Sequence, residues 1–313
     1  MIFSRLADIL LLKLPIYLPI LYGLILYNFN SYENLLVFIT LLLLAEPHFG
    51  ATWPFFLNNK NQNYILENKL NLIIFPILIT FISIFLFFYF KNFFYLIFLI
   101  FNFFHVTRQS VGITKLFVKN KDELEFHTLS IIVFGFIFLV VAVLRFYLNL
   151  RLINDNLLIF NVIVLSTISI LLLYNFIKYK VSENAYTLIT GILIFYPICF
   201  VDKPVHGIIM GVTMHYIQYL ALTYKVSLRR LNDENQFLES KIFDKNYLIV
   251  IIFYGIVMAI LSLSNTQNII DVNISYLLFI PLTGQMLHFY LDSFLWKFRE
   301  EHHRNVTLKY LKG

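Results

Sequence analysis

Ten stretches of about 20 mostly apolar residues follow one another along this chain of 313 residues. A helix needs about 20 such residues to cross the roughly 30 Å of hydrocarbon in a bilayer, where each backbone polar group must find a partner inside the protein. The sequence therefore predicts an all-α fold, a polytopic transmembrane helical bundle of about ten helices that forms one membrane domain over residues 1–313. The expected spans are 6–29, 34–57, 70–90, 93–117, 127–148, 156–177, 185–201, 204–224, 246–264 and 274–296.

The composition favours a membrane protein over a soluble one. Hydrophobic residues make up 59% of the chain and charged residues 13%, with a mean hydropathy of +0.76, whereas soluble domains carry about 25% charged residues. Cys199 is the single cysteine, which excludes an intramolecular disulfide and a cysteine-based zinc cluster. The residues behind the net charge of +6 lie mostly in the expected loops, which is the usual distribution in a membrane protein. We therefore expect no nucleic-acid partner.

The distribution of Lys and Arg predicts the orientation of the bundle, because these residues accumulate in cytoplasmic loops. With ten spans and a cytoplasmic N-terminus, only Lys91, Arg151 and Lys203 fall in outer loops, and most of the 24 Lys and Arg face the cytoplasm. Both termini are then cytoplasmic, and a bacterial inner membrane is the expected location. The cytoplasmic loop 225–245 is expected to lie along the lipid surface or to be a solvated connector, and residues 297–313 form a short cytoplasmic tail.

Four histidines lie inside the expected spans. An ionisable side chain at that depth costs roughly 2.5 kcal/mol or more unless it faces the protein interior or finds a partner. Their spans are all even-numbered and so run in the same direction, which places the four imidazoles within about 5 Å of one another in depth at ~1.5 Å per residue. The predicted metal ligands are His48, His105, His215 and His288.

Other polar residues accompany these histidines. Pro47, Gly50 and Pro54 surround His48 and predict a broken or kinked helix, because proline removes a backbone donor. Further along the chain, polar residues recur three or four positions from a histidine and so share its helix face. We expect orientation or proton transfer from Asp292, Gln109 and Gln218, and charge balance between a buried Arg108 and a carboxylate of Glu46 or Asp292.

The type of site remains open between several alternatives. A cluster of imidazoles without thiolates suits iron, zinc, copper or nickel, and histidines with open coordination positions are typical of non-haem Fe(II). Haem held by two facing histidines is the alternative cofactor, and a proton-coupled membrane transporter is the alternative function. Each histidine alone is also explained by a hydrogen bond to a neighbouring helix. We expect His206 to be polar packing or an entrance residue, His127 to be interfacial, and His302 and His303 to be surface residues.

The motifs "PHFGA", "FFHVTRQ", "MHYIQY" and "LHFYLDSFLWKF" occur in this order. The set resembles, distantly, the Brp/Blh family of integral-membrane β-carotene 15,15'-dioxygenases, in which histidines of a helical bundle hold iron. The resemblance implies iron-binding roles for His48, His105, His215 and His288, with Asp292 as the partner of His288. In this chain Tyr219 stands where the family has a further histidine. The resemblance and the histidines together predict a membrane-embedded non-haem iron oxygenase that takes O₂ and an apolar substrate, such as a carotenoid, isoprenoid or lipid, from the membrane lipid.

Overall fold

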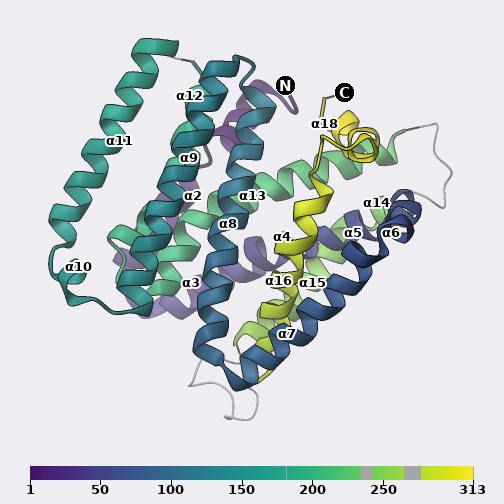
Figure 1. Ribbon diagram of the computed structural model, residues 1–313, viewed down its shortest axis with the longest axis horizontal. Helices are drawn as coiled ribbons and strands as arrows, with labels where there is room; N and C mark the ends of the chain where they lie inside the picture. Colours follow the sequence, from purple (N-terminus) through teal and green to yellow (C-terminus); the bar gives the residue numbers. More distant parts are fainter. Residues whose placement is uncertain (181, 234–241, 264–275, 313) are drawn as a thin grey trace. The chain divides into compact units, whose positions relative to one another are not determined.

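The computed structural model describes residues 1–180, 182–233, 242–263 and 276–312, and these residues contain helices but no strand (Figure 1). The all-α prediction is therefore confirmed over this part of the chain. The residues form two compact units, which are described separately below. One comprises Met1–Ile2, Asn34–Phe98 and Tyr219–Gly313, and the other Phe3–Glu33 and Leu99–Gln218. We call them the histidine-48 unit and the histidine-105 unit.

Among the residues that the structure describes, five helical segments are long and apolar enough to cross a membrane, which fits a membrane protein. A sixth candidate is the segment pair Arg5–Lys13 and Tyr17–Asn28, which is bent by 54°. The number of ten spans and the cytoplasmic termini stay predictions. The five segments are Asn30–Phe56, Leu70–Tyr89, Lys91–Phe117, Lys121–Tyr147 and Leu157–Tyr179.

The histidine-48 unit is a bundle whose longer helices are α7 (Phe75–Tyr89), α15 (Tyr247–Leu263) and α16 (Phe279–Leu295). Helix α16 packs beside α7, and α15 packs against α4 (Glu46–Gly50) (Figure 1). Two glycines allow the latter approach. A Cβ on Gly255 would lie 2.8 Å from Pro47 Cγ, and a Cβ on Gly50 would lie 2.8 Å from Tyr254. Small residues of this kind let membrane helices come close together.

The predicted break around Pro47 is present as a change of helix type. A π-helix, η3 (Leu41–Ala45), leads directly into α4, and α5 (Thr52–Phe56) follows after Ala51. Pro47 has no N–H for a regular helical bond, so a wider turn before it is a common solution. The break turns α4 and α5 into short, separate segments, and it is these segments that carry His48 and Thr52.

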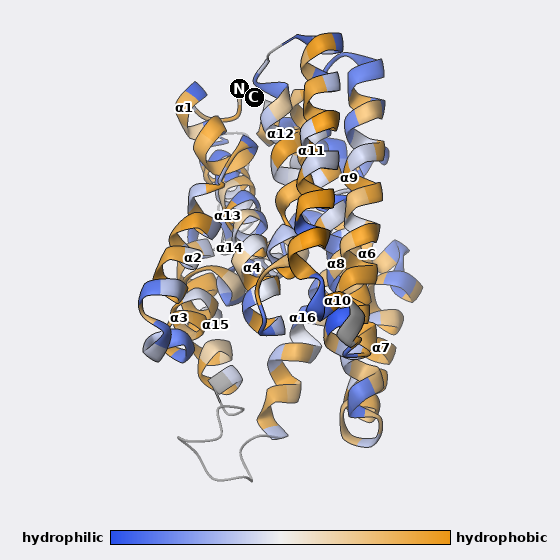
Figure 2. Cartoon of the chain, turned by 90° about the vertical axis from the view of Figure 1, so that its left-hand side faces the viewer, coloured by the Kyte–Doolittle hydropathy of each residue, from blue (hydrophilic) through white to orange (hydrophobic). Residues whose placement is uncertain are grey.

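The histidine-105 unit contains α9 (Lys121–Ala142), α11 (Leu157–Tyr179) and α12 (Asn184–Leu193). Helix α12 packs on α9, where a Cβ on Gly191 would lie 2.6 Å from Ile131 Cδ1. Apolar residues cover most of α9 and α11 (Figure 2). The expected span 185–201 is not one continuous helix, because α12 ends at Leu193 and a 3₁₀-helix, η7 (Tyr196–Cys199), follows it.

The remaining elements include connectors and the two long helices α8 (Lys91–Phe117) and α13 (Pro204–Leu231), each of which contributes residues to both units. The others are α1 (Arg5–Ala7), η1 (Asp8–Lys13), α2 (Tyr17–Asn28), η2 (Asn30–Tyr32), α3 (Glu33–Thr40), η4 (Asn59–Asn61), α6 (Gln62–Glu67), η5 (Leu70–Ile74), η6 (Val143–Tyr147), α10 (Arg151–Asp155), α14 (Ile242–Lys245), α17 (Glu301–His303), η10 (Arg304–Leu308) and α18 (Lys309–Lys312).

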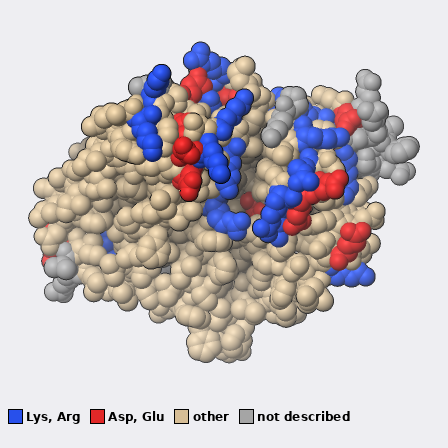
Figure 3. Space-filling view, turned by 45° about the horizontal axis from the view of Figure 1, so that its top comes forward, with Lys and Arg blue, Asp and Glu red and all other residues tan. Residues whose placement is uncertain are grey.

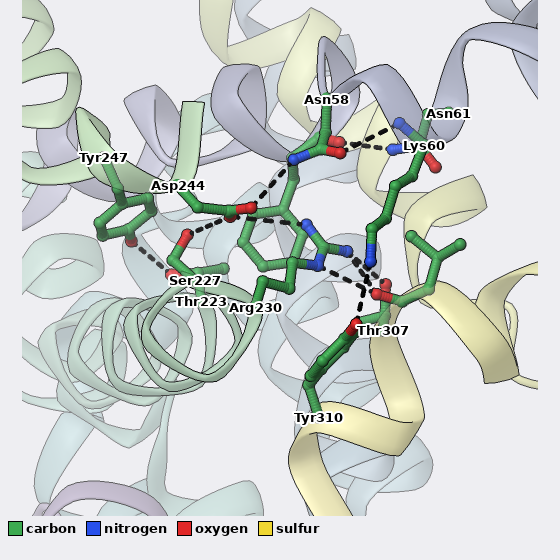
Figure 4. A network of polar contacts seen from close by, with 12 residues as sticks. Asn58, Lys60, Asn61, Thr223, Ser227, Arg230, Asp244, Tyr247, Thr307 and Tyr310 are labelled. Carbon is green, nitrogen blue, oxygen red and sulfur yellow. Dashed lines mark hydrogen bonds and ion pairs between the residues drawn. The ribbon is translucent and has the colours of Figure 1, made fainter. Parts of the chain in front are cut away.

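The predicted loop 225–245 differs from the structure at its start. Helix α13 continues to Leu231, and residues 234–241 of the loop lie outside the described residues. Arg230, instead of lying on a lipid surface, is fully buried near Asp244, at 3.9 Å (Figure 4). It also donates a hydrogen bond to the Val306 carbonyl. Its guanidinium also lies over the Phe55 ring. These contacts account for the burial of an arginine that the sequence places in a loop.

The tail is folded onto the histidine-48 unit. Tyr310 accepts a hydrogen bond from Lys60 at 2.9 Å (Figure 4). It also donates one to Asp233 at 2.7 Å. His303 is only 1% exposed and packs edge-on against Tyr64, so the expectation that it is a surface residue is wrong. Charged side chains gather in limited patches, while broad areas of the surface in view carry none (Figure 3).

Candidate functional site

Two of the predicted ligands lie in contact in the histidine-48 unit. His48 of α4 and His288 of α16 have ring centroids 4.4 Å apart, with the rings inclined by 67°. They are 0% and 1% exposed. The structure thus brings together two imidazoles that the sequence separates by 240 positions, in an interior where only groups with partners are stable.

A chain of hydrogen bonds extends from His288. Its Nδ1 lies 2.5 Å from Thr52 Oγ1, and the same hydroxyl lies 3.1 Å from the phenol oxygen of Tyr219. Thr52 was not among the predicted site residues. It lies four positions after His48, the spacing of neighbours on one helix face, and that spacing was the available signal. Since Thr52 engages Nδ1, Nε2 is the nitrogen of His288 that would bind a metal.

Asp292 lies at the other end of this chain. Its Oδ1 accepts a hydrogen bond from Tyr219 at 2.7 Å and another from Trp296 Nε1 at 2.7 Å. Asp292 was expected to orient a histidine, and these hydrogen bonds connect it to His288 through Tyr219 and Thr52. Tyr219 itself packs edge-on against His48, with ring centroids 4.6 Å apart.

Glu46 has partners other than the predicted arginine. Its carboxylate is completely buried and accepts hydrogen bonds from Gln285 at 3.0 Å and from Ser262 at 3.5 Å. Arg108 belongs to the histidine-105 unit, where it is exposed and lies 5.4 Å from the centre of the Phe104 ring. Arg108 is therefore not buried within the protein, and its charge balance with Glu46 or Asp292 stays a prediction.

The other two predicted ligands form a second pair in the histidine-105 unit. His105 of α8 and His215 of α13 have ring centroids 5.0 Å apart, with the rings nearly perpendicular at 89°. They are 7% and 1% exposed. The structure thus joins His48 with His288 and His105 with His215, and the common depth of all four stays a prediction. Buried histidines and carboxylates of this kind could hold a metal ion.

The two glutamines near this second pair differ in their contacts. Gln218 is 1% exposed, and its amide donates to the Leu12 carbonyl at 2.6 Å. That carbonyl lies at the end of η1, where the chain bends before α2, so Gln218 satisfies a backbone acceptor released by the break. Gln109 lies four residues after His105 on α8 and is partly buried. Its role in orientation or proton transfer stays a prediction.

Other histidines have their own partners. His206 lies 2.7 Å from the Tyr22 hydroxyl and 3.4 Å from Glu33, which agrees with polar packing. His127 is 0% exposed and bonded to Asn175 of α11 at 2.8 Å. Its position at the membrane interface stays a prediction.

A partly open groove of about 370 Å³ lies on the histidine-48 unit. Apolar side chains of η3, α13 and α15 line it, together with Pro47 and the rings of Tyr224 and Tyr247. Pro47 immediately precedes His48, so the helix segment that carries the histidine also forms part of the groove wall.

A comparison with protein-family models finds no match, and no similar chain is found among curated proteins or solved structures. The resemblance to the Brp/Blh family, which rests on short motifs, therefore stays a prediction.

Proposed function

We propose that this protein is a membrane-embedded metal-dependent oxidoreductase, a non-haem iron oxygenase acting on an apolar, lipid-soluble substrate. The observation that supports it best is the contact between His48 and His288, together with the Thr52 hydroxyl at Nδ1 of His288. A histidine that binds a metal commonly has its other ring nitrogen held by a hydrogen bond, which fixes the tautomer and the ring orientation.

The donor set of the histidine-48 unit fits a first-row transition metal. His48 and His288 would supply nitrogen, and the Tyr219 ring packs edge-on against both imidazoles. Iron held in this way would activate O₂, and the open coordination positions that this needs are typical of histidine-bound Fe(II). The chain's own residues orient His288 and, with full burial of both rings, exclude water from the site.

The groove beside Pro47 supports an apolar substrate. Its lining is hydrocarbon and aromatic, so a hydrocarbon chain fits it through van der Waals packing, which drives association inside a bilayer. A substrate dissolved in the bilayer reaches such a surface without crossing water. We propose isoprenoid or acyl chains as the substrate class.

Contact within each histidine pair favours an ion over haem. Two axial ligands of one haem lie on opposite faces of the porphyrin, so the ring plane must fit between them. The centroids of His48 and His288 are 4.4 Å apart, and those of His105 and His215 are 5.0 Å apart. Neither contact leaves space for a porphyrin between the two rings of the pair.

Metal analysis of the detergent-purified protein tests this proposal. We expect iron in stoichiometric amount, and loss of most of it in His48→Ala and His288→Ala. His302→Ala, in the tail, is the matched control and should retain the metal. The sequence predicts one ion for all four histidines, so His105→Ala and His215→Ala should also lose it. Purified protein that contains no metal and binds none when iron is added would contradict the proposal. A haem absorption spectrum would show that the cofactor is haem and not a non-haem iron ion.

A proton-coupled transporter is the second candidate, and Glu46 favours it. A carboxyl group that is 0% exposed within a candidate span is typical of proton pathways in transporters. Glu46→Gln would then abolish solute uptake by proteoliposomes while leaving any bound metal unchanged. The oxygenase proposal predicts no uptake that depends on a proton gradient.

A further inference from the structure

Asp292 connects two oxidisable side chains. A single oxygen, Oδ1, accepts hydrogen bonds from the Tyr219 phenol and from the Trp296 indole, each at 2.7 Å. The two rings lie close to each other, with centroids 5.7 Å apart. Tyrosine and tryptophan are the side chains that lose one electron most readily to strong oxidants. The carboxylate is therefore placed to receive a proton from either.

The two rings differ in burial. Tyr219 is 0% exposed and packs against both His48 and His288. Trp296 is only partly buried and follows the last residue of α16, Leu295. The pair thus extends from the histidines to a position that a reagent in solution can approach.

We propose that Tyr219, Asp292 and Trp296 form a one-electron relay between the histidine pair and the protein surface. Tyr219 gives one electron to an oxidised metal ion at the histidine pair, the oxidant that the proposed function would supply. The Tyr219 O–H bond breaks, and the proton passes to Asp292 Oδ1. A neutral tyrosyl radical and a carboxylic acid result. Trp296 then gives one electron to Tyr219, and Asp292 returns the proton. The Trp296 radical cation finally takes one electron from a donor of the quinol class, which restores all three residues.

The carboxylate is needed because a phenol that loses an electron becomes a strong acid. In the protein interior, a proton without an acceptor would leave an uncompensated charge, which is costly. A charge-assisted hydrogen bond that already exists removes the need for reorganisation before the proton moves. The relay rests on the proposed function only for its oxidant, so it can be tested with an oxidant supplied from outside.

The test is photochemical oxidation of the full-length protein in detergent by ruthenium(III) tris-bipyridine, followed by transient absorption and electron paramagnetic resonance. The external oxidant takes an electron from the partly exposed Trp296, so the relay runs in reverse here, and we expect part of the tryptophan radical to be replaced by a tyrosyl radical until the two reach equilibrium. Tyr219→Phe and Trp296→Phe should each remove the kinetic phase in which the tyrosyl radical forms, which we call the tyrosyl phase. Asp292→Asn should slow it by about tenfold or more, since a hydrogen bond to a charged group is worth at least that factor. Because the proton moves with the electron, D₂O should slow it as well.

Trp53→Phe is the matched control, because Trp53 is the other tryptophan of the chain and is also partly buried. It should leave the phase unchanged. A tyrosyl phase that persists in Tyr219→Phe, responds equally to Trp53→Phe, or shows the same rate in D₂O would overturn the relay. The solvent comparison uses the unaltered chain, so it decides even where Asp292→Asn does not fold. Metal content is measured on the same samples, so a failed relay in protein that binds iron leaves the oxygenase proposal standing.

Discussion

Arg230 and Asp244 form an ion pair with no exposed side-chain surface on either partner, at 3.9 Å. Asp244 also accepts hydrogen bonds from Asn58 and Ser227 (Figure 4). The pair connects the end of α13 to the segment before α15, while Arg230 also reaches Val306 of the tail. The C-terminal residues are therefore coupled to the helical core through one guanidinium.

This coupling predicts a large effect when the pair is broken. Asp244→Asn leaves a buried cation uncompensated and should lower the stability by roughly 3–5 kcal/mol, whereas replacing both partners with apolar residues should cost less than the sum of the single changes. Thermal unfolding in detergent measures both effects. Lys309→Met is the control, because its pair with Asp233 at 3.6 Å is half exposed and such pairs contribute about 0–1 kcal/mol. Strict additivity in the double mutant would contradict the coupling.

Helix packing in the histidine-48 unit gives a second prediction. Gly255→Ala places a Cβ 2.8 Å from Pro47 Cγ and should lower the stability by roughly 1–3 kcal/mol through overpacking. Gly112→Ala is the matched control within helix α8. A Cβ there meets nothing within 4 Å, so the change should raise the stability by up to about 1 kcal/mol through helix propensity. Equal melting temperatures for the two variants would mean that the close approach of α15 and α4 is not tight.

A third prediction concerns the pH dependence of the folded tail. Burial lowers the pKa of His303 to about 4 from its usual value of 6.5. Between these values the unfolded chain binds a proton that the folded chain does not, so stability rises with pH across this window and is lost as the pH falls from about 6.5 to about 4. His303→Gln should flatten this part of the stability profile measured by unfolding at several pH values. A profile that keeps the wild-type slope would show that other groups cause it.

The orientation predicted from Lys and Arg leads to a fourth experiment. Reporter fusions after Lys121 and at the C-terminus should report the cytoplasm, and a fusion at Asn154 should report the outside, because positive residues stay in cytoplasmic loops. Lys121 begins α9, and Asn154 lies in α10, beyond the other end of the α9–η6 segment. Identical signals at Lys121 and Asn154 would exclude this segment as a single crossing.

The sequence predicts the helices well because apolar runs determine them directly, and it predicts Pro47 as a break because proline lacks a donor. It does not predict partners that come from distant positions. Arg230 is buried only because Asp244, Val306 and Phe55 surround it. No local pattern around Arg230 carries that information, and the same is true of Arg108, whose exposure depends on its surroundings on α8.

The histidines illustrate the same limit within the candidate site. Their location in apolar runs was sufficient to select them, but the pairing of His48 with His288 depends on how α4 and α16 pack. Thr52 was missed because threonine is common in membrane helices, where it usually bonds its own backbone, as Thr40 does with the Leu36 carbonyl. Its contact with His288 becomes visible only in the folded unit.

Thr52 supplies the last prediction, since it contacts His288 Nδ1 and the Tyr219 hydroxyl. Thr52→Val keeps the shape of the side chain but removes the hydroxyl. If the hydroxyl fixes the tautomer of a metal-binding His288, the change should weaken iron binding by about 10–100-fold, as measured by competition with a chelator. Thr52→Ser should restore the affinity. Thr40→Val removes a buried hydroxyl from the same candidate span and should leave the affinity unchanged. Equal affinities in Thr52→Val and Thr40→Val would show that Thr52 has only a structural role and that His288 is oriented by other contacts.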